Sequence, residues 1–81
     1  MSHLNLSIIA KDELVYQGEA GAIMVPTTTG IIEVLGEHMQ LVSALAPGAI
    51  VVGEKKFEIS GGVIEVRPHS EVIILADLVK K

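Results

Sequence analysis

Apolar residues along this chain alternate with polar ones or run together for a few positions, and nowhere do they follow a helical repeat. Leu4, Leu6 and Ile8 alternate with polar neighbours, as do Phe57 and Ile59. The stretches 63–66 and 72–75 place apolar residues on both faces of an extended chain. A period of two is the signature of strands, and the many branched valine and isoleucine side chains favour strands further. The pattern predicts an all-β protein.

Turn-forming residues divide these segments at short intervals. Turns are predicted at residues 11–13, 17–18, 26–30, 36–37, 47–48, 53–54, 61–62 and 68–70. Between them fit about eight to ten short strands, an arrangement typical of a β-sandwich or barrel. Four segments begin with a glycine and continue with mostly apolar residues, at Gly21, Gly30, Gly48 and Gly62. Their unequal spacing excludes a solenoid, so each is interpreted as a turn glycine followed by a strand.

The length and hydropathy indicate one folded domain with apolar surface to spare. The chain has 81 residues, which supports a single core, and 49% of them are hydrophobic, which excludes intrinsic disorder. A domain of this size buries only about 60% of the surface of its unfolded chain. Some apolar side chains must therefore face outward, and a contiguous patch of them indicates a protein partner.

The charge and the rarity of aromatic residues exclude several classes of function. The net charge is −4, and Tyr16 and Phe57 are the only aromatic residues. A phosphate-binding surface needs positive charge, and a base-stacking platform needs several rings, so no nucleic-acid partner is expected. The apolar stretches are far shorter than the roughly 20 residues of a membrane-spanning helix. No export signal is predicted, and with no cysteine there is no disulfide framework.

No combination of residues predicts catalysis. His3, His38 and His69 are too far apart in the sequence to form a metal-binding motif. Ser60 is followed by two glycines but lacks the surrounding pattern of a nucleophile elbow. No glycine-rich phosphate loop is present either. The sequence therefore predicts no catalytic residue, no metal and no cofactor.

The order of turns and strands nevertheless resembles one known family. The matching motifs are residues 15–19 (Val-Tyr-Gln-Gly-Glu), 23–26 (Ile-Met-Val-Pro), Gly30, His38 with Leu41, 45–48 (Leu-Ala-Pro-Gly), 60–66 (Ser-Gly-Gly-Val-Ile-Glu-Val) and 75–77 (Leu-Ala-Asp). Together they resemble the N-terminal β-sandwich domain of the epsilon subunit of bacterial-type rotary ATP synthases, called delta in mitochondria. The resemblance extends from about Leu4 to Asp77.

The resemblance implies a fold and a role. The fold is a ten-stranded sandwich of two five-stranded sheets over residues 1–77, followed by a short tail at 78–81 and no C-terminal helical domain. The role is that of a non-catalytic central-stalk subunit, which links the gamma subunit to the membrane c ring and helps couple ion flow to ATP synthesis. Such a subunit is peripheral and lies at the cytoplasmic face of the inner (plasma) membrane. Four residues after Asp77 are too few for the helical pair that binds ATP in longer members, so no bound nucleotide is expected.

The resemblance also implies contact residues. Those toward the c ring are Thr27, Thr28, Thr29, Gly30 and Ile31. Those toward gamma are Ala10, His38, Met39, Leu41 and Ser43. The family usually has an acidic residue where this chain has Ile31, so ring contacts are expected through hydroxyl and backbone groups instead of ion pairs. Around His38 the usual Pro-Gly-His-x-Pro-Leu turn reads Gly-Glu-His-Met-Gln-Leu over 36–41.

Two further expectations can be tested against a structure. One side of the strands at 63–66 and 72–75 should lack a core and face gamma, with Ile64 or Ile73 as outward-facing examples. The alternative function is a free-standing β-sandwich module that binds a protein or a small ligand. Carbohydrate sites generally use exposed aromatic rings, and only Tyr16 and Phe57 are available for one.

Overall fold

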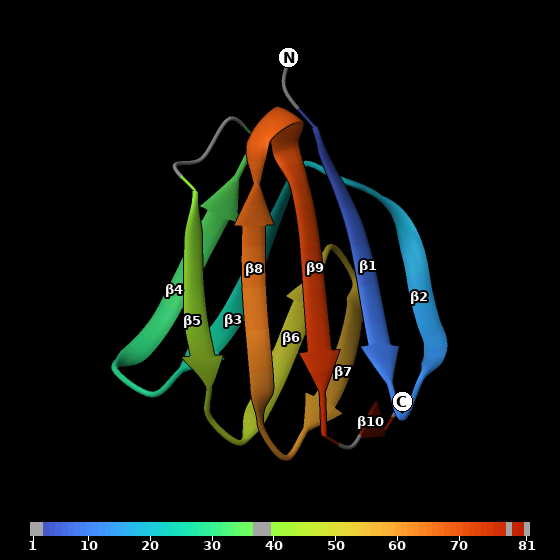
Figure 1. The fold of residues 1–81 in the computed structure, drawn as a ribbon, viewed down its shortest axis with the longest axis vertical. Coiled ribbons are helices and arrows are strands. Elements are labelled where there is room, and N and C mark those ends of the chain that lie inside the picture. Colours follow the sequence, from blue (N-terminus) through green and yellow to red (C-terminus); the bar gives the residue numbers. More distant parts are fainter. Residues whose placement is uncertain (1–2, 37–39, 78, 81) are drawn as a thin grey trace.

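The computed structural model describes residues 3–36, 40–77 and 79–80, and over these the protein is all-β, as predicted (Figure 1). A single 3₁₀ turn, η1 (Pro68–Ser70), interrupts the strands. The ten strands are β1 (Leu4–Ala10), β2 (Glu13–Ala20), β3 (Ala22–Thr27), β4 (Gly30–Leu35), β5 (Leu41–Leu45), β6 (Gly48–Val52), β7 (Lys55–Ile59), β8 (Gly62–Arg67), β9 (Glu71–Ala76) and β10 (Val79–Lys80).

The strands form two layers that face each other. One layer has the order β5-β8-β9-β1-β2, and the other has the order β10-β7-β6-β3-β4. Strands β1 and β9 pair in parallel, and all other pairs are antiparallel. Two separate sheets were predicted, but one backbone pair, Thr27 with Leu45, joins β3 to β5. The hydrogen-bonded sheet is therefore continuous and folds over at this point to make both layers.

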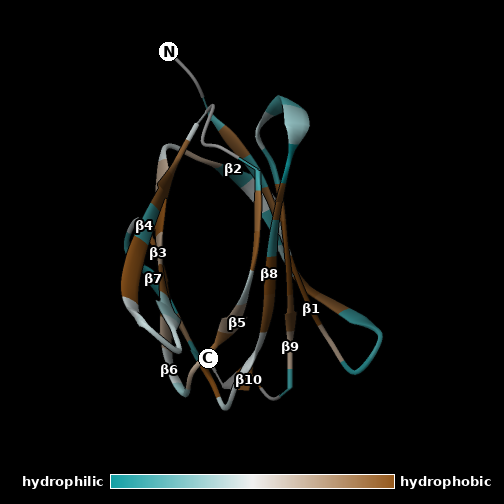
Figure 2. Cartoon of the chain, turned by 60° about the vertical axis from the view of Figure 1, so that its left-hand side comes forward, coloured by the Kyte–Doolittle hydropathy of each residue, from teal (hydrophilic) through white to brown (hydrophobic). Residues whose placement is uncertain are grey.

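The two layers face each other (Figure 2). The core between them is built mainly from alternate residues of the strands. Leu4, Leu6 and Ile8 of β1 are fully buried, as their alternation with polar neighbours predicted. On β8 and β9 the inward positions are Ile64, Val66, Val72 and Ile74. Burial of each such aliphatic side chain contributes about 1.5–3 kcal/mol to the free energy of folding. These positions therefore stabilise the sandwich most.

One local prediction is wrong. The turn at 17–18 does not exist, because β2 runs unbroken from Glu13 to Ala20. Gly18 lies under the Tyr16 side chain, whose hydroxyl would be 3.0 Å from a Cβ at position 18. The short tail predicted at 78–81 includes β10, whose Val79 and Lys80 pair with β7 and extend that layer by one strand.

The two aromatic residues close the open side of the sandwich, where β2 and β7 face each other without backbone pairing. The ring centroids of Tyr16 and Phe57 are 5.4 Å apart, and the Lys55 ammonium lies 5.0 Å from the centre of the Tyr16 ring. Tilted aromatic pairs and cation–π contacts are each worth about 0.5–1.5 kcal/mol. Side-chain contacts thus replace hydrogen bonds at this edge.

This edge gives a direct stability test. In a double-mutant cycle of Tyr16→Leu and Phe57→Leu, we expect a coupling free energy of about 0.5–1.5 kcal/mol, because each substitution removes the same ring pair. Urea denaturation of the four proteins measures it. Additive effects of the two substitutions would show that the rings close the edge independently.

Candidate docking surface

An unbroken row of apolar side chains crosses the outer face of the β5-β8-β9-β1-β2 layer. Backbone pairing places its members side by side on successive strands, one from each strand. We call this the apolar row: Ala44, Val63, Leu75, Ile9 and Leu14. Val63, Leu75 and Leu14 expose 40%, 52% and 57% of their surface. Since the layer's other face already fills the core, the apolar row has nothing within the described chain to cover it.

The face becomes more polar with each row away from the apolar row. The adjacent row contains Val42, Glu65, Ile73, Ser7 and Gln17. The row after that contains Arg67, Glu71, Asn5 and Glu19. Figure 2 shows this layer with hydrophobic stretches on β1, β8 and β9 and hydrophilic turns at both ends. An apolar strip with a polar border is the usual anatomy of a protein–protein interface.

The prediction of an apolar outer side on 63–66 and 72–75 is confirmed, but one of its two examples is wrong. Ile64 is fully buried and points into the core, whereas its neighbour Val63 is exposed. Ile73 lies on the outer face and is half-buried. Sequence reasoning missed Leu14 and Ile9, although each stands beside a second apolar residue, the signal of a strand with two apolar faces.

The turn between β3 and β4 was predicted to touch the c ring, and the structure divides its residues into two groups. Thr27 is only 5% exposed, and its hydroxyl bonds to the Gly30 carbonyl and to the backbone N–H of Thr29. Thr28, Thr29 and Gly30 are exposed, and Ile31 exposes 70% of its surface. Thr27 therefore shapes the turn from inside and does not offer its side chain to a partner.

Three of the residues predicted to contact gamma are described, namely Ala10, Leu41 and Ser43, and these three do not form one patch. Leu41 and Ser43 of β5 are half-buried. They pair with Val66 and Ile64 of β8, which face the core. Ala10 lies at the other end of the layer from Leu41, because pairing through β9 and β8 aligns Ala10 with Leu45. His38 and Met39 lie outside the described residues.

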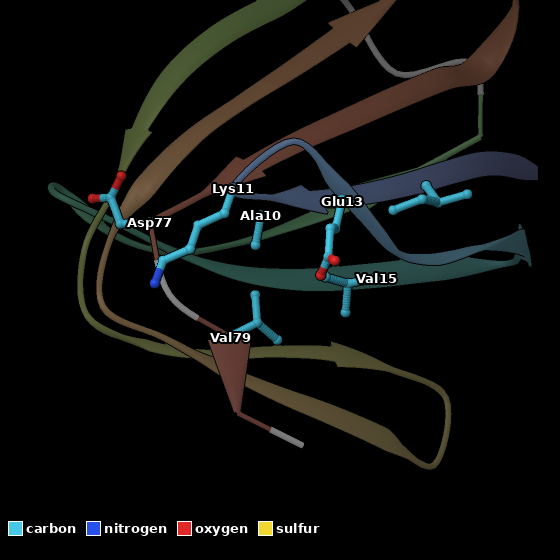
Figure 3. A pocket seen from close by; sticks show the side chains of 7 residues that line it. Ala10, Lys11, Glu13, Val15, Asp77 and Val79 are labelled. Atoms are coloured by element: carbon cyan, nitrogen blue, oxygen red, sulfur yellow. The ribbon is translucent and has the colours of Figure 1, made fainter.

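A hollow of about 400 Å³ borders the apolar row at Leu14 (Figure 3). Ala10, Val15 and Val79 form its apolar wall, and Lys11, Glu13 and Asp77 stand around it. In the part of the chain that the structure describes, no group of three or more histidine or acidic side chains could hold a metal ion. Nor does any described helix have the length and apolarity needed to span a membrane. The hollow carries no constellation that indicates catalysis, so the extended outer face is the stronger candidate site.

Comparison with known proteins identifies the family of this sandwich. Residues 3–81 match the family described as ATP synthase, Delta/Epsilon chain, beta-sandwich domain. The chain belongs to this family. Among relatives, it is 38% identical to the ATP synthase epsilon chain of Alkalilimnicola ehrlichii over 95% of its own length and 58% of the relative's. It is 36% identical to that of Moorella thermoacetica over its whole length and 63% of the relative's. The chain thus spans about three fifths of the length of these relatives.

Solved structures show the same delta/epsilon sandwich. A chain in the mitochondrial ATP synthase of Euglena gracilis, in a structure comprising OSCP, F1 and the c ring, superimposes with a TM-score of 0.87. The identity is 31%, and the match covers 99% of this chain and 54% of the other. A chain of the Tetrahymena thermophila central stalk and c ring matches with a TM-score of 0.78 at 13% identity, which supports the fold alone. The expected family and fold class are confirmed.

Proposed function

We propose that this chain is a non-catalytic subunit of the ATP synthase central stalk, where its sandwich links the gamma subunit to the c ring. The observation that carries the proposal is the exposed apolar row on a domain of the delta/epsilon family. A row that crosses all five strands of one layer offers a broad, stiff surface instead of a pocket. Such a surface suits a part that transmits torque, because strands packed on a filled core resist deformation.

The proposal assigns the apolar row to gamma and the β3–β4 turn to the ring. The turn lies at one end of the sandwich (Figure 1). The apolar row crosses the outer face of the other layer and begins next to the turn, where the Thr28 N–H donates a hydrogen bond to the Ala44 carbonyl. A subunit with these two surfaces can contact two partners at once. The complex would hold it at the cytoplasmic face of the membrane as a peripheral subunit.

The gamma contact predicts a large effect of one substitution. Leu75→Asp should weaken binding to gamma at least tenfold, because it places an unpaired charge in the middle of the apolar row. The matched control is Met24→Asp, which changes a residue of similar exposure (43%) on the outer face of the other layer. Titration of gamma with each variant measures the dissociation constant. Equal binding by both variants would contradict the assignment of gamma to this face.

The ring contact predicts a different response. Ile31→Arg should weaken capture of purified c ring several-fold, whereas Leu35→Arg should not. Both residues are exposed on β4, but Ile31 adjoins the turn and Leu35 is at the strand's far end. Since residues 27–31 carry no charge, ring capture by the unmodified protein should change little with salt. A steep loss of capture at moderate salt would move the contact away from this turn.

A further inference from the structure

The charges of the protein are divided unequally between the two layers. The layer with the apolar row, including its turns, carries Asp12, Glu13, Glu19, Glu65, Glu71 and Asp77, against Lys11 and Arg67. On the other layer the positive and negative charges of the described side chains nearly cancel. Glu33, Glu54 and Glu58 stand against Lys55 and Lys56. The negative charge of the described residues is therefore concentrated on the layer that carries the apolar row.

Three of these carboxylates lie within two residues of the apolar row. Glu13 and Asp77 stand at the end of the layer, where Glu13 pairs with Ala10, one position beyond the Ile9–Leu14 pair, and both line the hollow together with Lys11. Glu65 lies between Val42 and Ile73 in the adjacent row and is 3.3 Å from the Arg67 guanidinium. Glu13 and Asp77 make no ion pair with the side chains that the structure describes. They are exposed, so their fields reach into the solvent at the end of the layer next to the row.

We infer that the partner of this face presents an apolar strip bordered by lysine or arginine residues, and that charge attraction speeds its association. This inference rests on the proposed function and specifies the chemistry that the docking region of gamma must have. Complementary potentials raise association rates well above those of neutral pairs, and salt suppresses the gain.

The same charges disfavour other occupants of the face. A second copy of this chain would bring two acidic borders together, and like charges across an interface are unfavourable. An anionic lipid surface or a nucleic acid would be repelled in the same way. A basic protein surface is left as the complementary partner.

The test measures the rate of association with purified gamma as a function of salt. For the unmodified protein, the rate constant should fall about tenfold between roughly 20 and 300 mM salt. The double variant Glu13→Gln, Asp77→Asn should associate more slowly at low salt and lose most of this dependence. The matched control Glu33→Gln, Glu58→Gln neutralises two carboxylates of the other layer and should behave like the unmodified protein.

The possible outcomes separate this inference from the proposed function. If Leu75→Asp abolishes binding but the rate constant is insensitive to salt, the basic border is wrong and the docking face stands. Equal effects of the two double variants would also overturn the inference, since overall charge would then explain the rates. Absence of any binding to gamma by the unmodified protein would overturn both.

Discussion

Replacing Gly62 with alanine should destabilise the protein by about 4 kcal/mol or more, or prevent folding. A Cβ at this position would lie 2.1 Å from the Leu75 carbonyl oxygen and 2.9 Å from the Ala76 Cα. Both atoms belong to the backbone of β9, which pairs with β8 along its length. The φ of +145° is also a conformation that side chains disfavour. Two core strands would have to separate to accommodate one methyl group.

Two other glycines separate the steric effect from the backbone effect. Gly53 has a φ of +58° but open space around its Cβ position, so Gly53→Ala should cost about 1 kcal/mol. Gly21 has open space and no positive φ, so Gly21→Ala should change the unfolding free energy little. Urea denaturation of the three variants gives the comparison. If Gly62→Ala costs no more than Gly53→Ala, the close approach of β9 does not determine the residue at position 62.

The sequence predicts the strands well because their signals are local. Alternation in β1 and β7, and a turn residue before most strands, identify the elements without any knowledge of their partners. Pairing is not local. The parallel contact of β1 with β9 joins residues more than sixty positions apart, and no pattern in the chain indicates it. The single pair between Thr27 and Leu45 that joins the layers is equally invisible in the sequence.

The candidate site is predictable only in part for the same reason. That β8 and β9 have a second apolar side is evident from their composition, but the buried side depends on register. An irregularity between Ile8 and Ile9 shifts the pairing with β2 and brings Leu14 into the apolar row. The triple threonine predicts a polar turn, yet only the fold reveals that Thr27 turns its hydroxyl inward. Composition identifies such surfaces, and tertiary packing selects their members.

Adjacent residues of β8 should respond in opposite ways to the same substitution. Ile64→Asp places a carboxylate in a fully buried position with no described partner, so it should cost at least about 3–5 kcal/mol and leave much of the protein unfolded. Val63→Asp changes a side chain that is 40% exposed, so it should cost about 1 kcal/mol or less and leave a cooperative unfolding transition. Circular dichroism with urea denaturation measures both.

Binding to gamma provides the second measurement for this pair. Val63→Asp should fold and still lose at least tenfold in affinity, because it charges the apolar row without disturbing the core. A conservative variant, Ile64→Val, should show the reverse: a loss of about 0.5–1.5 kcal/mol in stability and unchanged affinity for gamma. A folded Val63→Asp protein that binds gamma normally would exclude this part of the row from the interface. Reduced affinity in both variants would indicate instead that binding follows overall stability, since a side chain buried on the other face of β8 cannot contact the partner.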